Sequence, residues 1–94
     1  MVTANVILIH ILVKNYWINK TGTASYRIPD GLTNTILSEV KNYSGTLSYT
    51  NQLKDFVMYS QSKGLEMHLY TNAQLTGPLQ NIVDSGLIQV FPLK

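Results

Sequence analysis

The clearest pattern of apolar and polar positions lies between residues 48 and 64. Ser48 or Thr50 can cap the start of a helix here, and Gly64 is a typical residue just past a helix C-terminus. The positions at core spacing between these signals are Leu53, Phe56, Val57 and Ser60. The pattern therefore predicts an amphipathic helix that ends at about Lys63.

Two segments before this helix have the character of strands. Residues 25–29 form a short strand that Pro29 ends or places at an edge, and residues 35–41 alternate with the period of a strand. The alternation places Ile36, Ser38 and Val40 on one face and Leu37, Glu39 and Lys41 on the other. Asp30-Gly31 is a strong turn dipeptide, so we expect the two segments to pair as a hairpin, followed by a loop over residues 42–47.

The second half of the chain alternates strands with a helix. Residues 65–70 predict a strand, residues 78–85 a short helix that Gly86 ends, and residues 87–91 a final strand. With a first strand expected over residues 5–13, the order is β-β-β-α-β-α-β. Strands separated by helices of this length imply right-handed crossovers, so the sequence predicts an α/β fold with a mixed sheet and a parallel second half.

The apolar run near the N-terminus allows more than one interpretation. Residues 5–13 are rich in β-branched side chains without clean alternation, which fits a strand covered on both sides or a short buried helix. The run is about half the length of a membrane-spanning helix, and no basic residue precedes it as in a secretory signal. We expect no membrane partner, and a homodimer formed through this segment is a reasonable expectation.

Composition narrows the chemistry further. A chain of 94 residues forms one domain at most, and 45% hydrophobic residues with 13% charged residues fit a folded core. The net charge of +2 is too small to indicate a polyanionic partner by itself. The absence of cysteine excludes disulfides, thiolate zinc sites and cysteine nucleophiles. Only five acidic residues are shared among all roles: Asp30, Glu39, Asp55, Glu66 and Asp84.

Three of the charged residues are spaced as in a hydrolytic metal site. Glu39 and Lys41 are two apart on one strand and must project to the same face, and Asp30 lies at the turn that leads into that strand. Two carboxylates at one point are costly unless a cation lies between them, and such hard oxygen ligands suit Mg²⁺ or Mn²⁺. The plainer interpretation is a turn aspartate beside a solvated strand face.

The same residues carry a resemblance to a known family. Pro29-Asp30 followed by Glu39-Val40-Lys41 resembles the PD-(D/E)xK signature of restriction-endonuclease-like phosphodiesterases. The wider sequence over about residues 25–90 is similar to toxin domains of that fold at the C-termini of bacterial polymorphic toxins of the Rhs and contact-dependent inhibition type. The resemblance implies a single domain with a nuclease core over residues 25–94 and an atypical apolar segment over residues 1–24.

The resemblance also implies a function and a set of roles. It implies metal-dependent cleavage, most simply of DNA, with Asp30 and Glu39 as metal ligands and Lys41 as the catalytic amine. Gln52 is a further candidate that orients Lys41 or contacts phosphate. It implies a cognate immunity protein and delivery into a target bacterial cell, although action in the cytoplasm of the producing cell stays open.

Three more residues are candidates for substrate contact, and one feature of the sequence departs from the pattern of the nuclease family. Arg27, Lys54 and His68 are candidates for nucleic-acid contacts, although isolated exposed cations more often only contact solvent. Residues 1–29 contain no Asp or Glu, whereas many members of the fold supply a further acid from an N-terminal helix. Glu66 could replace that acid only if its strand brings it to the same face. The alternative function is therefore an inactive relative of the nuclease fold that works as a binding or self-assembly module.

Overall fold

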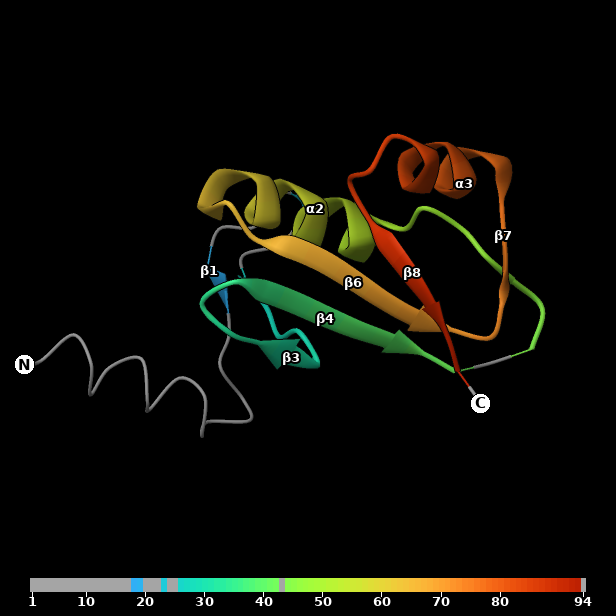
Figure 1. The fold of residues 1–94 in the computed structure, drawn as a ribbon, viewed down its shortest axis with the longest axis horizontal. Helices are drawn as coiled ribbons and strands as arrows, with labels where there is room; N and C mark the ends of the chain where they lie inside the picture. The colour runs from blue at the N-terminus through green and yellow to red at the C-terminus, as the bar shows by residue number, and fades with distance from the viewer. Residues whose placement is uncertain (1–17, 20–22, 24–25, 43, 94) are drawn as a thin grey trace, which may run out of the picture.

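The computed structural model describes residues 18–19, 23, 26–42 and 44–93. Within them, three short strands precede a long one, and two helices alternate with the strands that follow (Figure 1). The elements are β1 (Ile18–Asn19), β2 (Tyr26–Arg27), β3 (Gly31–Leu32), β4 (Ile36–Lys41), β5 (Thr46–Leu47), α2 (Asn51–Lys63), β6 (Glu66–Thr71), β7 (Gln74–Leu75), α3 (Gly77–Asp84) and β8 (Gln89–Pro92).

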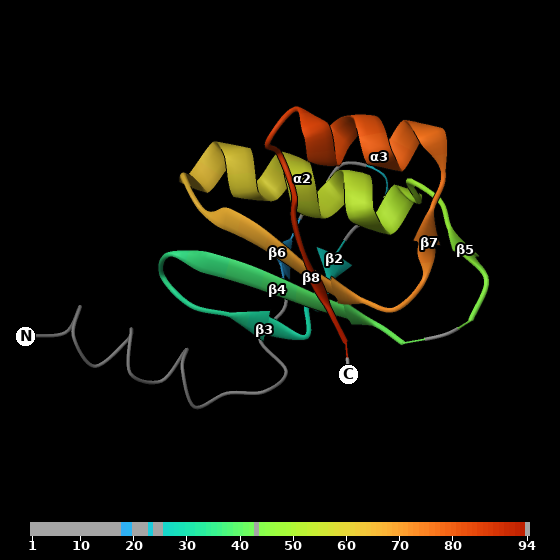
Figure 2. The same cartoon turned by 45° about the vertical axis from the view of Figure 1, so that its right-hand side comes forward.

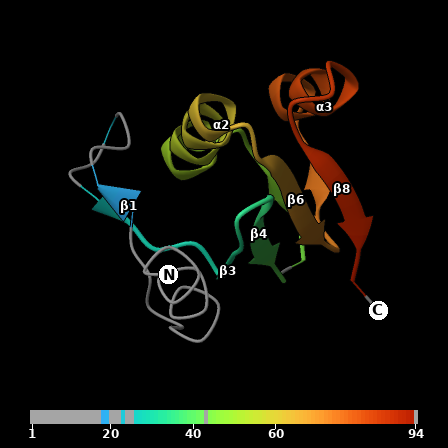
Figure 3. The same cartoon turned by 60° about the vertical axis from the view of Figure 1, so that its left-hand side comes forward.

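The central sheet has four strands in the order β3-β4-β6-β8. Strand β3 is antiparallel to β4, whereas β4, β6 and β8 run parallel to one another. Helices α2 and α3 provide the two parallel crossovers and lie on the same side of the sheet (Figures 1 and 3). The predicted α/β class with a mixed sheet and a parallel second half is thereby confirmed.

The hairpin that leads into β4 differs from the predicted one. The turn lies at residues 33–35 rather than at Asp30-Gly31, because Gly31 is already part of β3 and pairs with Ser38. The Thr33 hydroxyl accepts the backbone amides of Thr35 and Ile36 at 3.2 and 2.9 Å, and this local bonding closes the turn. Strand β2, which lies within the expected strand over residues 25–29, pairs with β1 instead, and the antiparallel partner of β4 is β3.

Helix α2 forms as its sequence predicts. The Thr50 side chain caps it by accepting the Leu53 amide at 3.2 Å. Gly64 ends it with a φ of 67°, a left-handed conformation that side chains with a Cβ rarely adopt. The four positions at core spacing between these caps are all buried.

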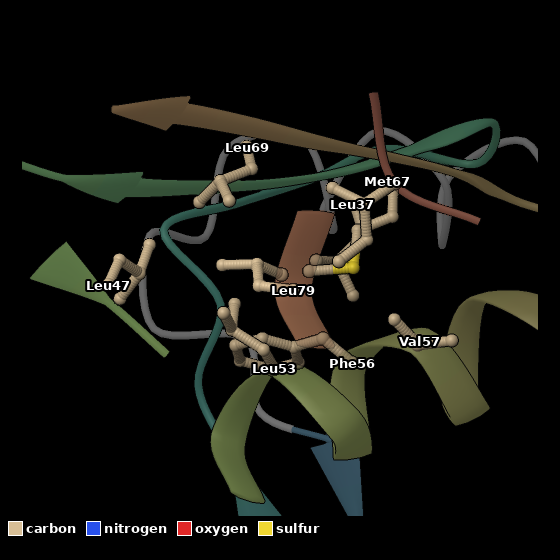
Figure 4. Packing of buried hydrophobic residues seen from close by; sticks show 9 residues of the cluster. Leu37, Leu47, Leu53, Phe56, Val57, Met67, Leu69 and Leu79 are labelled. Carbon is tan, nitrogen blue, oxygen red and sulfur yellow. The ribbon is translucent and has the colours of Figure 1, made fainter. Parts of the chain in front are cut away.

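The hydrophobic core lies between the sheet and the two helices (Figure 4). Buried positions alternate along β4 and β6, as a sheet covered on one side requires, and the core receives Leu37 from β4 and Met67 and Leu69 from β6. The buried apolar residues are Leu37, Leu47, Leu53, Phe56, Val57, Met67, Leu69, Leu79 and Ile88. The core thus fixes β4 against β6 and against α2, the two elements that carry most of the candidate site.

Some parts of the fold were not predicted, and some predictions cannot be compared with the structure. The expected loop over residues 42–47 contains β5, which pairs in parallel with β7 beside the main sheet (Figure 2). The expected first strand over residues 5–13, and the dimer through that segment, lie outside the described residues. No helix in the part of the chain that the structure describes has the length and hydrophobicity to cross a membrane.

Candidate active site

Strand β4 directs Glu39 and Lys41 to the helix side of the sheet. In the parallel register with β6, Glu39 lies beside Leu69 and Lys41 beside Thr71, both of which are buried. The predicted alternation is therefore correct: Leu37, Glu39 and Lys41 share one face. Glu39 is only 3% exposed, which is unusual for a carboxylate and requires compensating polar contacts.

Asp30, just before β3, supplies one of these contacts and makes a second contact with the neighbouring residue of β4. Its backbone amide donates to Glu39 Oε1 at 3.1 Å, and its own Oδ2 accepts the Val40 amide at 2.7 Å. This reciprocal pair fixes Asp30 against β4, although Asp30 itself stays exposed. The two carboxylates are thereby held in neighbouring positions by backbone groups rather than by long flexible side chains.

Lys41 connects the strand to helix α2. Its Nζ lies 3.2 Å from Glu39 Oε2 and donates to Gln52 Oε1 at 2.5 Å. Gln52 is the second residue of α2, so the capped start of the helix positions its amide over the strand. The structure thus brings together all four predicted residues, Asp30, Glu39, Lys41 and Gln52, in one continuous chain of contacts.

The electrostatics of the site centre on Glu39. Burial raises the pKa of its carboxyl above the usual value, and the negative charge of Asp30 raises that pKa further. The hydrogen bond from the Asp30 amide and the charge of Lys41 lower the pKa but do not offset these effects. Glu39 therefore carries its charge at a cost, which a cation beside the carboxylates would reduce.

The donor set fits a hard divalent cation. Two carboxylates from adjacent segments, one buried and one exposed, offer oxygen ligands and an open side toward solvent, which is what Mg²⁺ or Mn²⁺ requires. Among the described residues, no group of three or more His, Cys, Asp or Glu side chains gathers as metal ligands. Water and substrate oxygens would have to complete the coordination, as is common for Mg²⁺.

The strand partner of β4 does not provide a third acid. Glu66 pairs with Ile36 and His68 with Ser38, so both point to the face opposite Glu39. On that face His68 Nε2 lies 2.9 Å from Glu66 Oε1, and its ring lies 5.0 Å from that of Phe91. His68, a candidate for nucleic-acid contact, thus lies on the face of the sheet opposite Glu39.

The two other candidates for nucleic-acid contact have different surroundings. Arg27 Nε forms an ion pair at 3.0 Å with Asp55, a fully buried residue of α2. Lys54 is exposed, and its Nζ lies 5.6 Å from the centre of the Tyr49 ring. Sequence reasoning did not assign a role to Asp55. Its position three residues after Gln52, one helical turn along α2, is the signal that relates it to the site.

A mixed sheet with helices on one side and a clustered Asp-Glu-Lys set define the class of restriction-endonuclease-like domains. The family model described as restriction endonuclease fold toxin 7 matches residues 8–80. The chain belongs to this family of toxins with the restriction endonuclease fold, as its sequence resemblance suggested. Searches of curated proteins and of solved structures give no match to this chain.

Proposed function

We propose that this domain is a metal-dependent nuclease that hydrolyses phosphodiester bonds, most simply those of DNA, as the effector domain of a bacterial toxin. The observation that carries the proposal is the chain of contacts from Asp30 through Glu39 and Lys41 to Gln52. A lysine amine held beside a buried carboxylate, which itself neighbours an exposed one, suits hydrolysis of a phosphate ester better than it suits a structural role. Membership of the toxin family supports the same class of activity.

In this proposal Asp30 and Glu39 would hold the metal ion, Mg²⁺ or Mn²⁺. When bound, the ion would polarise the scissile phosphate and lower the pKa of a water molecule. Lys41 provides a positive charge that offsets the charge developing on the phosphate oxygens, and its Nζ–H groups can orient the attacking water. Gln52 accepts one Nζ–H, so that the amine stays directed at the carboxylates rather than at solvent.

The raised pKa of Glu39 supports a site that is completed by a cation. A carboxylate that is buried beside a second carboxylate is destabilised when it is ionised, and a divalent ion removes that penalty on binding. Lys41 alone does not remove it, because the pKa of Glu39 stays raised in its presence. The site therefore has an electrostatic reason to take up a cation at neutral pH.

The partners follow from the proposed activity. A toxin nuclease acts on nucleic acid in a target bacterial cell, and its producer needs a cognate immunity protein as protection. We propose DNA as the substrate, and the test described below distinguishes it from RNA. Lys54, two residues after Gln52 on α2, is the candidate for a phosphate contact that stays exposed.

One observation favours a second function. The described residues offer two carboxylates rather than three at the site, and residues 1–29 contain no acid at all. A relative of the fold that lost metal binding would keep the core and act as a binding or self-assembly module. That alternative predicts an intact fold with no cleavage under any metal.

The test is incubation of the purified protein with supercoiled plasmid DNA and with total RNA, each in Mg²⁺, in Mn²⁺ and in chelator. Lys41→Ala is the informative variant, and Lys63→Ala, at the far end of α2, is the matched control. Metal-dependent nicking of DNA by the parent and by Lys63→Ala, but not by Lys41→Ala, supports the proposal. Cleavage of RNA alone would change the substrate, and no cleavage in any metal would favour the second function.

A further inference from the structure

A polar network around buried Asp55 links helix α2 to the segment that carries Asp30. Asp55 is fully buried (0% exposed), and both of its carboxylate oxygens accept hydrogen bonds. Oδ1 accepts the Thr23 amide at 2.9 Å, while Oδ2 accepts the Thr23 hydroxyl at 2.6 Å and Arg27 Nε at 3.0 Å. The Arg27 guanidinium also donates to Thr23 Oγ1 at 3.1 Å. The network joins residues 28 and 32 positions apart in the sequence.

Arg27 is connected to Asp30 by a stiff spacer. Ile28 precedes a proline, which restricts its backbone to extended conformations, and Pro29 has a fixed φ and is buried. A shift of the Arg27 backbone is therefore passed on to Asp30 rather than absorbed between them. Asp30 must be placed accurately, because one short contact, Oδ2 to the Val40 amide, holds its carboxylate against β4.

Helix α2 thus contacts both sides of the site through residues one turn apart. Gln52 holds Lys41, and Asp55 holds Arg27. We propose that Asp55 and Arg27 are a positioning pair, which fixes the Pro29-Asp30 segment so that Asp30 lies opposite Glu39. The inference rests on the proposed function for its purpose, since the pair would set the spacing of the two metal-holding carboxylates. Arg27 then acts on the site through Asp30, and its guanidinium is not a substrate contact.

The first experiment needs no metal and no activity. Amide hydrogen exchange of Val40 reports the bond to Asp30, and exchange of Leu69, in the centre of the sheet, reports global opening. In Asp55→Asn we expect Val40 to lose at least about tenfold more protection than Leu69, because the bond to Asp30 opens locally. Val57→Ala, a buried apolar change on the same helix that removes none of the network's hydrogen bonds, should alter both amides equally.

The second experiment measures Mn²⁺ affinity by calorimetry with the same proteins. Asp55→Asn should bind Mn²⁺ at least about tenfold more weakly than Val57→Ala, since a misplaced Asp30 loses its part of the site. Changes no larger than those of Val57→Ala, in exchange and in affinity, would overturn the inference. A parent that binds no Mn²⁺ would instead contradict the proposed function, while the exchange comparison would still decide whether the pair positions Asp30.

A milder pair of variants covers the case in which Asp55→Asn does not fold. Thr23→Val keeps the shape of the side chain and removes the hydroxyl that bridges Asp55 and Arg27, whereas Thr23→Ser keeps that hydroxyl. The inference predicts faster exchange of the Val40 amide in Thr23→Val and parental exchange in Thr23→Ser. Equal exchange in the two variants would contradict it.

Discussion

Replacing Gln52 with methionine removes the hydrogen-bond acceptor of Lys41 while keeping the length of the side chain. Of the two contacts that Lys41 Nζ makes with described residues, only the one with Glu39, at 3.2 Å, then remains. A hydrogen bond to a charged group contributes about 1.5 to 3 kcal/mol. If that contribution holds the amine in the geometry of the transition state, its loss slows the chemical step by about 10- to 100-fold, at about 1.4 kcal/mol per factor of ten.

The assay is single-turnover nicking of supercoiled plasmid at saturating Mg²⁺, so that neither substrate binding nor metal binding limits the rate. Gln61→Met is the matched control, because Gln61 is an exposed glutamine near the other end of the same helix. It should nick at the parental rate, and both variants should unfold in urea close to the parent, since each change lies outside the core.

Two results would show that Gln52 does not position Lys41 for catalysis. Parental nicking by Gln52→Met, with Lys41→Ala inactive, would show that the amine needs no positioning from α2. A loss in Gln52→Met that Gln61→Met shares would show that the effect is general to the helix rather than specific to the contact with Lys41.

Glu39, Asp55 and Leu69 each give a further testable prediction. The pKa of Glu39 is raised above 4.5 in the metal-free site, so nicking at sub-saturating Mg²⁺ should fall with pH already above that value, as the carboxyl of the free site is protonated. A pH-rate profile at that Mg²⁺ concentration that stays flat down to 4.5 would contradict this. Burial alone would raise the pKa of Asp55, but hydrogen bonds from Thr23 and Arg27 hold it below 3.8. The stabilisation that this lowered pKa contributes is present above pH 3.8 and is lost as the pH falls through the lowered pKa. Urea unfolding should therefore show Asp55→Asn less stable than the parent by about 2 to 4 kcal/mol at pH 7. At pH 3 the stability of the variant should be closer to that of the parent. Leu69→Ala should cost about 2 to 5 kcal/mol in the same measurement, because Leu69 is fully buried between the sheet and the helices, and a cost under about 1 kcal/mol would mean that the core is not packed there.

Helix α2 was predictable because its signals are local. Thr50, the core spacing and Gly64 act within a few residues of one another, and each favours the same helix. Strands β6 and β8 and helix α3 were also predicted in the right order, with ends that differ by one or two residues. The face of Glu39 and Lys41 followed from strand alternation alone.

The hairpin was predicted at the wrong turn because two local signals compete. Asp30-Gly31 favours a tight turn, yet the Thr33 hydroxyl bonds the next amides and closes the turn there. Asp30 instead bonds Val40 and Glu39, which are distant in sequence. Turn propensities of dipeptides do not take account of contacts with distant residues, so the register of β3 on β4 could not be predicted from the local sequence.

Contacts between distant segments account for the remaining differences. Strands β5 and β7 are two residues each, and they pair only because both chain segments pass beside the sheet. The ion pair of Arg27 with Asp55 depends on where α2 packs, which the sequence pattern does not specify. His68 was correctly placed on a strand face with Glu66, but the parallel register with β4 decides that this face is opposite Glu39.

The proposed nuclease activity depends on the carboxylates of this site and on Lys41. Glu39 contacts both Asp30 and Lys41, so the most direct measurement compares plasmid nicking by the parent and by Glu39→Gln at one Mg²⁺ concentration, with urea unfolding to show that both are folded. We expect nicking by the parent and only background by the variant. Nicking at the parental rate by a folded Glu39→Gln protein would show that the site does not carry the activity.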